Sequence, residues 1–148
     1  MKEPVYLDVC ALCRLFDDQS YLRIRLETEA VNLIVSKVRS GELALMVSPV
    51  HYREIADISE PKERIELETL LNHIGITIDA DMVASKKRTK DLISKRFGLA
   101  DAAHVAFAEQ AGASFITCDD KLVKKCLTSD IAVWTGSPTA FCEKEKLK

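Results

Sequence analysis

The protein has 148 residues, a length typical of a single domain that folds without disulfides or a structural metal. Hydrophobic residues make up 47% and charged residues 30%, as in ordinary globular proteins, and a formal charge of -2 excludes a strong overall attraction to nucleic acid. Residues 1–4 lead into a strand-like run, and no stretch approaches the roughly 20 apolar residues that span a bilayer. We therefore expect neither a signal peptide nor a membrane segment.

Short apolar runs alternate with longer helical stretches. In chain order, the apolar runs predict strands at 5–7, 44–47, 74–78, 115–116 and 131–134. The patterns between and after them predict helices at 9–16, 20–39, 49–58, 61–72, 80–96, 99–111 and 120–126. This alternation predicts an α/β fold, a three-layer α/β/α sandwich around a parallel sheet of about five short strands. We expect one domain over residues 1–148, with its core at about 5–138 and a frayed, charged tail at 139–148.

Four acidic residues are expected at one edge of that sheet. Asp8 follows the first strand, Asp119 follows the fourth, Glu54 lies in the helix after the second, and Asp101 begins the helix that leads into the fourth. Each alone could be a helix cap or a solvated side chain. Ligands of parallel sheets, however, bind beyond the carboxyl ends of the strands. Because clustered carboxylates repel one another, their conjunction predicts a bound cation.

Carboxylate oxygens favour Mg²⁺ or Mn²⁺ over zinc, and such ions activate water and neutralise charge on a phosphodiester. We expect Asp8, Asp101 and Asp119 to hold metal. Glu54 would hold a second ion or orient the attacking water. Asp120 is a further carboxylate, for which we first expect a helix-capping role.

Four stretches in this order and spacing resemble the PIN-domain family over about residues 5–138, namely 6–8, 48–54, 98–108 and 112–119. The resemblance implies a small metal-dependent nuclease that cuts RNA, and many members are toxins of toxin–antitoxin pairs. It assigns Asp8, Glu54, Asp101 and Asp119 to the family's acidic quartet, with Thr117 and Ser48 as supporting hydroxyls. Cys10 departs from the family, which often has Asn or Ser there, and a thiol is a weaker hydrogen-bond partner.

The predicted function is therefore a Mg²⁺- or Mn²⁺-dependent endoribonuclease, with RNA as substrate and a toxin of the VapC-like type as one role. The alternative is a PIN-like module that binds RNA or a protein without cutting. A cognate antitoxin and a homodimer are the expected partners. The apolar faces of residues 21–39 or 61–72 could form the dimer.

Other patterns carry less specific interpretations. Cys10 and Cys13 form a C-x-x-C pair, which indicates either redox chemistry or, as we prefer, two buried helix thiols. The five cysteines lack a disulfide pattern and predict reduced thiols in a cytoplasmic protein. The His51–Glu54 and Asp101–His104 spacings place each pair on one helix face, and we expect core or rim positions for the histidines. Phosphate binding or a solvated surface could explain the basic residues Lys86, Lys87, Arg88, Lys90, Lys95 and Arg96.

Two other phosphate-processing folds are excluded by single positions. A haloacid-dehalogenase-like phosphatase would have an Asp two residues after Asp8, where this chain has Cys10. A response-regulator receiver would have a Lys after the last strand, where Thr135 and Gly136 stand.

Overall fold

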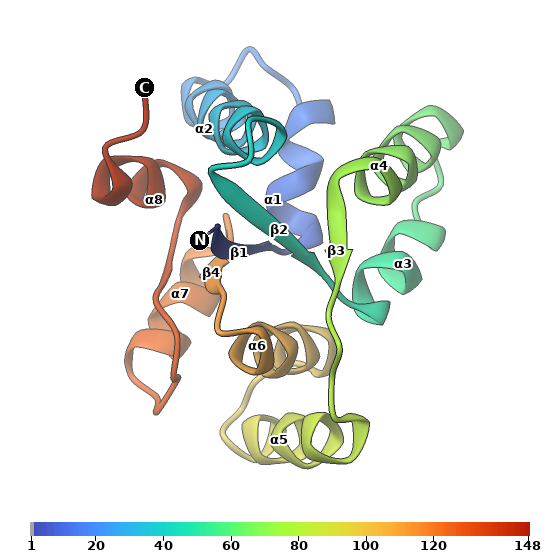
Figure 1. Ribbon diagram of the computed structural model, residues 1–148, viewed down its shortest axis with the longest axis vertical. Coiled ribbons are helices and arrows are strands. Elements are labelled where there is room, and N and C mark those ends of the chain that lie inside the picture. Colours follow the sequence, from blue (N-terminus) through green and yellow to red (C-terminus); the bar gives the residue numbers. More distant parts are fainter. Residues whose placement is uncertain (1) are drawn as a thin grey trace.

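The computed structural model describes residues 2–148 (Figure 1). Its centre is a five-stranded sheet in the order β3-β2-β1-β4-β5, and every neighbouring pair is parallel. The strands are β1 (Glu3–Leu7), β2 (Leu43–Val47), β3 (Gly75–Thr77), β4 (Ser114–Ile116) and β5 (Thr135–Gly136). The chain adds β2 and β3 on one side of β1 and then crosses to add β4 on the other. This reversal between β1 and β4 is a topological switch point, where ligands of such sheets bind.

Helices connect the strands and cover both faces of the sheet (Figure 1). They are α1 (Val9–Leu12), the 3₁₀ helix η1 (Cys13–Phe16), α2 (Leu22–Arg39), α3 (Pro49–Ala56), α4 (Pro61–Ile74), α5 (Met82–Ser94), α6 (Leu99–Ala111), α7 (Asp120–Leu127) and α8 (Pro138–Glu145). Figure 1 shows α1 and α2 on one side of the sheet and α5 and α6 on the other. The three-layer α/β/α sandwich with a parallel sheet of five short strands is thereby confirmed.

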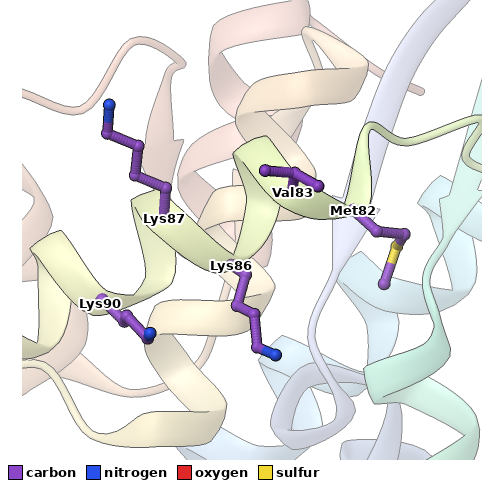
Figure 2. Close-up of a pocket in the computed structure, with 5 residues that line it drawn as sticks. All are labelled: Met82, Val83, Lys86, Lys87 and Lys90. Atoms are coloured by element: carbon purple, nitrogen blue, oxygen red, sulfur yellow. The ribbon is translucent and has the colours of Figure 1, made fainter.

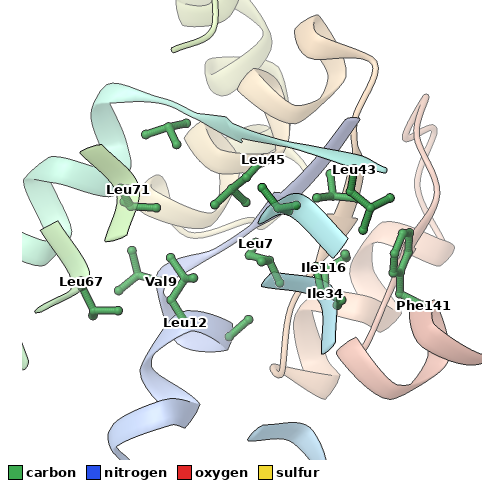
Figure 3. Packing of buried hydrophobic residues seen from close by; sticks show 14 of the residues in the cluster. Leu7, Val9, Leu12, Ile34, Leu43, Leu45, Leu67, Leu71, Ile116 and Phe141 are labelled. Atoms are coloured by element: carbon green, nitrogen blue, oxygen red, sulfur yellow. The ribbon is translucent and has the colours of Figure 1, made fainter. Parts of the chain in front are cut away.

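The alternation of side chains along β1 divides the core into two clusters. Val5 and Leu7 point into the cluster beneath α1, α2 and α4, part of which is shown in Figure 3. Tyr6 points to the opposite face, where it packs with Phe115 and residues of α6. This follows from the two-residue period of a strand. It also brings the hydroxyl of Tyr6 close to the polar residues of α3 and α6.

The fifth strand differs from the prediction. Residues 131–134 are irregular, and the short β5 follows them at Thr135–Gly136. Ile131 and Val133 instead pack against the edge of the second cluster. The backbone N–H of Phe115 donates to the carbonyl of Trp134 at 2.8 Å, so pairing with β4 begins only there. Irregular apolar residues that pack against the edge of the core have the same sequence pattern as a short strand, which is why the strand was predicted at 131–134.

The expected tail at 139–148 is also wrong, because α8 occupies most of it. Ser137 caps this helix by accepting the N–H of Ala140 at 3.1 Å. Phe141 is fully buried in the first cluster and packs edge-on against Trp134, with ring centroids 5.7 Å apart. The Lys144 ammonium lies 5.2 Å from the centroid of the Trp134 ring. The buried Phe141 and the Lys144–Trp134 contact therefore hold a segment whose charged composition suggested fraying.

Several helix boundaries shift by a few residues. The helix expected at 9–16 divides into α1 and η1, and α5 begins after Asp81, which caps it, instead of after Asp79. The glycine stop predicted at residue 112 is confirmed: Gly112 adopts φ 61°, a left-handed conformation suited to glycine. Within residues 2–148, no helix combines the length and apolarity needed to cross a membrane.

Candidate active site

The site begins where β1 and β4 end side by side. Leu7 pairs with Ile116, so Asp8 and Thr117 each lie one residue beyond the paired strands. The backbone N–H of Asp8 donates to the Ile116 carbonyl at 3.1 Å, which extends the ladder by one bond. Two strands that are far apart in the sequence thus place the carboxylate of Asp8 and the hydroxyl of Thr117 at the same edge of the sheet.

Asp8 is almost completely buried, with 3% of its surface exposed. One carboxylate oxygen, Oδ1, accepts the N–H of Ala11 at 2.9 Å and caps α1. Burial raises the pKa of Asp8 from 3.8 to about 6, while hydrogen bonding from Thr117 and Ala11 opposes the rise. A carboxylate in this position is costly to ionise, and such perturbed groups concentrate at functional sites.

Asp119 and Thr117 lie at the end of β4. Asp119 is exposed and caps α7, because its Oδ1 accepts the N–H groups of Lys121 at 3.0 Å and Leu122 at 3.2 Å. The Thr117 hydroxyl is fully buried and accepts the N–H of Asp119 at 3.1 Å. Thr117 therefore lies between Asp8 and Asp119 and contacts both.

Asp101 lies in the first turn of α6 and is partly buried. Its pKa is raised, first by burial and second by the negative charge of Asp119, with Glu54 adding to the effect. Asp101 in turn raises the pKa of Asp8. Asp101 therefore lies close enough to Asp8, Asp119 and Glu54 for their charges to be linked through it, with Asp119 and Glu54 raising its pKa and Asp101 raising that of Asp8.

Glu54 lies in the second turn of α3 and is held by a histidine of α6. Its Oε1 accepts a hydrogen bond from Nε2 of His104, whose side chain is buried. This bond is the main reason that the pKa of Glu54 is lowered. The sequence suggested a His51–Glu54 pair and an Asp101–His104 pair, each within one helix. The structure instead pairs Glu54 with His104 across two helices.

The donor set fits a hard divalent cation. Mg²⁺ keeps several waters and takes only one or two protein carboxylates, so a complete cage of side chains is not required. As the side chains stand, no group of three or more His, Cys, Asp and Glu within residues 2–148 is placed to hold one ion. An ion at this edge would take one or two of the carboxylates Asp8, Asp101 and Asp119 directly and would reach the rest of this set through its bound water.

Asp120 does not cap a helix, contrary to the prediction. Its carboxylate pairs with Arg23 through two hydrogen bonds of 2.8 Å, and Asp119 takes the cap position. Asp120 points toward α2, on which Arg23 lies, and the charge of Arg23 lowers its pKa. The two consecutive aspartates are therefore divided between a cap beside the site and a surface ion pair.

Cys10 and Cys13 are more accessible than predicted. Cys10 is exposed, Cys13 is intermediate, and all five cysteines are free. Partial burial raises the pKa of Cys10 to about 11 and that of Cys13 to about 12, so both remain thiols at neutral pH. Because the thiolate is the reactive form, these values disfavour a redox role. Asp8 and Asp119 contribute to the raised pKa of Cys10, which indicates that this thiol lies at the rim of the site.

A buried polar cluster under the site was not predicted from the sequence. The Tyr6 hydroxyl lies 2.7 Å from Ser48 Oγ and 2.5 Å from His104 Nδ1. His51 bonds to the Leu7 carbonyl at 2.7 Å. The available signal in the sequence was a tyrosine in an otherwise apolar strand, together with one histidine in each of α3 and α6, the helices that carry Glu54 and Asp101.

The basic residues of α5 divide into two groups. Arg88 bonds to Glu109 at 2.7 Å and Lys95 bonds to Asp130 at 2.7 Å, so both have structural partners. Lys86, Lys87 and Lys90 are exposed and extend from the helix beside Met82 and Val83 (Figure 2). In the described part of the chain these three lysines form no ion pair. Both interpretations, a solvated surface and phosphate binding, therefore stay open for Lys86, Lys87 and Lys90, whereas Arg88 and Lys95 are engaged by acidic partners.

Comparison with known proteins identifies the class to which this fold and site belong. The PIN-domain family model matches residues 5–126, more than half of the chain. The protein therefore belongs to the PIN-domain family, whose members are generally nucleases, a class of hydrolases. No curated protein matches the chain.

Two solved structures are similar in fold. FitAcB from Neisseria gonorrhoeae is 15% identical, with a TM-score of 0.54 over 91% of this chain and 98% of that chain. FitAB bound to an IR36 DNA fragment is also 15% identical, with a TM-score of 0.56 over 90% of this chain and 94% of that chain. At this identity the likeness shows a shared fold.

Proposed function

We propose that this protein is a Mg²⁺- or Mn²⁺-dependent endoribonuclease. The observation that carries the proposal is the convergence of acids from three distant segments at the switch point of the sheet. Asp8 and Asp119 follow adjacent parallel strands, and Asp101 interacts electrostatically with both. Membership in a family of nucleases supports the reaction class.

The proposed roles follow from the environment of each residue. Asp8, Asp101 and Asp119 would hold the ion, which when bound would activate water and neutralise charge on the phosphodiester. Glu54, already ionised and hydrogen-bonded, would orient the attacking water or take a second ion. Thr117 would support Asp119 by accepting its backbone N–H, and Ser48 caps α3, the helix that carries Glu54.

A cleavage assay on mixed RNAs tests this proposal. Wild-type protein with Mn²⁺ should cleave, and chelation should stop the reaction. Asp101→Asn should abolish cleavage, because it removes the carboxylate that neighbours the other acids while keeping nearly the same shape. Asp120→Asn is the matched control and should cleave like wild type, since Asp120 is tied to Arg23. Equal activity of wild type and Asp101→Asn would exclude catalysis at this site, and no cleavage by wild type would favour the alternative, a PIN-like module that binds without cutting.

A toxin role with a cognate antitoxin is the biological context that we propose. It rests on the family, in which many members are toxins, and on the fold shared with FitAB. Expression of the chain alone should arrest growth, and co-expression of a small neighbouring reading frame should relieve the arrest. Growth arrest that persists with Asp101→Asn would contradict a nuclease toxin.

A homodimer is proposed through α2. Three apolar side chains near its start are unusually exposed, at 64%, 61% and 48% for Tyr21, Leu22 and Leu26. The α4 face offers Ile65, which is 59% exposed. Exposed apolar side chains grouped at one end of a helix are typical of interaction sites. Light scattering should give twice the chain mass, and Leu26→Glu should return it to the monomer value.

A further inference from the structure

Two buried histidines, His51 and His104, lie next to each other beneath the site, but they differ in their hydrogen-bond partners. Their ring centroids are 5.1 Å apart, and both side chains are almost fully buried. His51 bonds only to backbone, accepting the Ser48 N–H at 3.0 Å and donating to the Leu7 carbonyl at 2.7 Å. His104 bonds only to side chains, Tyr6 and Glu54. Only His104 therefore connects the core to a side chain of the site.

The direction of each bond follows from the chemistry of the groups. The ionised carboxylate of Glu54 can only accept, so Nε2 of His104 carries a hydrogen and donates to it. In this tautomer Nδ1 accepts, and the buried Tyr6 hydroxyl donates to it. The Tyr6 oxygen then accepts from the hydroxyl of Ser48, which lies 2.7 Å away. This Ser48–Tyr6–His104–Glu54 relay leaves none of its polar groups unsatisfied.

The relay ends at the one member that reaches solvent. The side chain of Glu54 is 37% exposed, whereas that of His104 is 2% exposed. A partly exposed glutamate on a helix normally samples several rotamers, and ordering it costs conformational entropy. Here one oxygen, Oε1, is fixed by a donor that is itself locked in the core. The other oxygen, Oε2, is left to interact with whatever the site binds.

We infer that His104 is a positioning residue, which fixes the carboxylate of Glu54 for metal or metal-bound water through the relay with Tyr6 and Ser48. This inference rests on the proposed function. Hydrogen-bond partners behind metal-binding groups orient them, and their loss typically weakens metal affinity or activity by roughly 10–100-fold. A purely structural role would not require the buried pair to end on a side chain of the site.

The experiment measures Mn²⁺ affinity by isothermal titration calorimetry on folded, metal-free protein at one pH. His104→Leu removes both ring nitrogens and should weaken Mn²⁺ binding roughly 10–100-fold. His104→Gln keeps an N–H that can reach Glu54 and should recover most of the affinity. Tyr6→Phe removes the donor that fixes the tautomer and should weaken binding in the same direction, by less.

Two controls separate positioning from general damage to the core. His51→Gln removes an equally buried histidine, and glutamine at this helix position can still accept the Ser48 N–H. It should lower the melting temperature but leave Mn²⁺ affinity within about twofold, well short of the loss expected when a hydrogen bond that orients a metal ligand is removed. In a double-mutant cycle, His104→Leu should have no further effect once Glu54→Gln is present, because both changes remove the same interaction.

The outcomes distinguish this inference from the proposed function. Wild-type protein that binds no Mn²⁺ would overturn both. Wild-type binding with equal losses in the His104 and His51 variants, or additive losses in the double mutant, would overturn the positioning role alone. If His104→Leu does not fold, Tyr6→Phe decides: a loss of affinity supports the relay, and unchanged affinity overturns it.

Discussion

Asp8 and Asp119 occupy equivalent places in the fold but differ in their exposure to water. Each follows a strand of the central pair, and each caps a helix through its Oδ1. Asp8 is 3% exposed, whereas Asp119 is on the surface. A capping bond can be made equally well by an exposed residue, so capping does not explain why Asp8 is buried. The difference indicates that the fold accepts a cost at Asp8 to place a carboxylate deep in the site.

The largest effect expected from this difference is on stability without metal. The pKa of Asp8 in the folded protein, about 6, lies above its ordinary value of 3.8. Between these values the folded state keeps a proton that the unfolded state has lost, so stability falls as pH rises through this window and stays lower above it. The difference corresponds to about 3 kcal/mol.

Asp8→Asn should therefore stabilise the metal-free protein at pH 7.5 by up to about 3 kcal/mol, because Asn keeps the cap without the charge. Urea denaturation in the presence of a chelator measures this gain, which should shrink as the pH falls from about 6 toward about 4, the window between the folded and unfolded pKa of Asp8. Asp119→Asn is the matched control and should change stability little. A loss of stability in Asp8→Asn at neutral pH would contradict this account, because it would mean that the ionised carboxylate of Asp8 stabilises the metal-free fold.

Binding of Mn²⁺ should offset the destabilisation that the buried Asp8 carboxylate causes in the wild-type protein. Mn²⁺ at about 100 times its dissociation constant should stabilise the folded state by about 2.7 kcal/mol, seen as a rise in melting temperature. Asp8→Asn should lose most of this rise, since it lacks the buried anionic ligand. A rise of the same size in wild type and Asp8→Asn would place the ion elsewhere.

Removal of the Asp119 cap should have a smaller effect. Asp119→Ala leaves the N–H groups of Lys121 and Leu122 without their acceptor, which should cost about 1 kcal/mol in the metal-free protein. Asp119→Asn should preserve that stability but reduce Mn²⁺ affinity. Denaturation curves for the two variants, compared with calorimetry, separate capping from metal binding. Equal Mn²⁺ affinity in wild type and Asp119→Asn would remove Asp119 from the ligand set.

The smallest effect is expected at the neighbouring Asp120. Its ion pair with Arg23 joins side chains that are 67% and 56% exposed, and such pairs contribute little. Asp120→Asn should leave melting temperature and Mn²⁺ affinity unchanged within error. A clear loss of affinity would show that the acidic site extends one residue further than we propose.

Much of this arrangement could be predicted from sequence because it depends on local periodicity. Asp8 and Asp119 follow apolar runs, and parallel strands deliver such positions to one edge regardless of their separation along the chain. The exception among the acids was Asp120, since nothing local tells which of two consecutive aspartates caps the helix and which turns toward Arg23 on α2.

The remaining features depend on contacts between distant segments. The His104–Glu54 bond joins α6 to α3, and the anchoring of α8 depends on Phe141 meeting Trp134. Residues 139–148 have the charged composition of a disordered tail. That Phe141 anchors them can be recognised only when the part of the core into which it packs is known. The same limitation applied to residues 131–134, because an apolar run in the sequence can mean either a strand or an irregular segment that packs against the core.

The most direct test of the metal-dependent site is a crystal structure of the protein soaked with Mn²⁺, using anomalous scattering to locate the ion. We expect an anomalous peak at the carboxyl ends of β1 and β4, within coordinating distance of Asp101 and of Asp8 or Asp119. A fully occupied peak elsewhere, or no peak at this edge in crystals whose active site is open to solvent, would contradict the account.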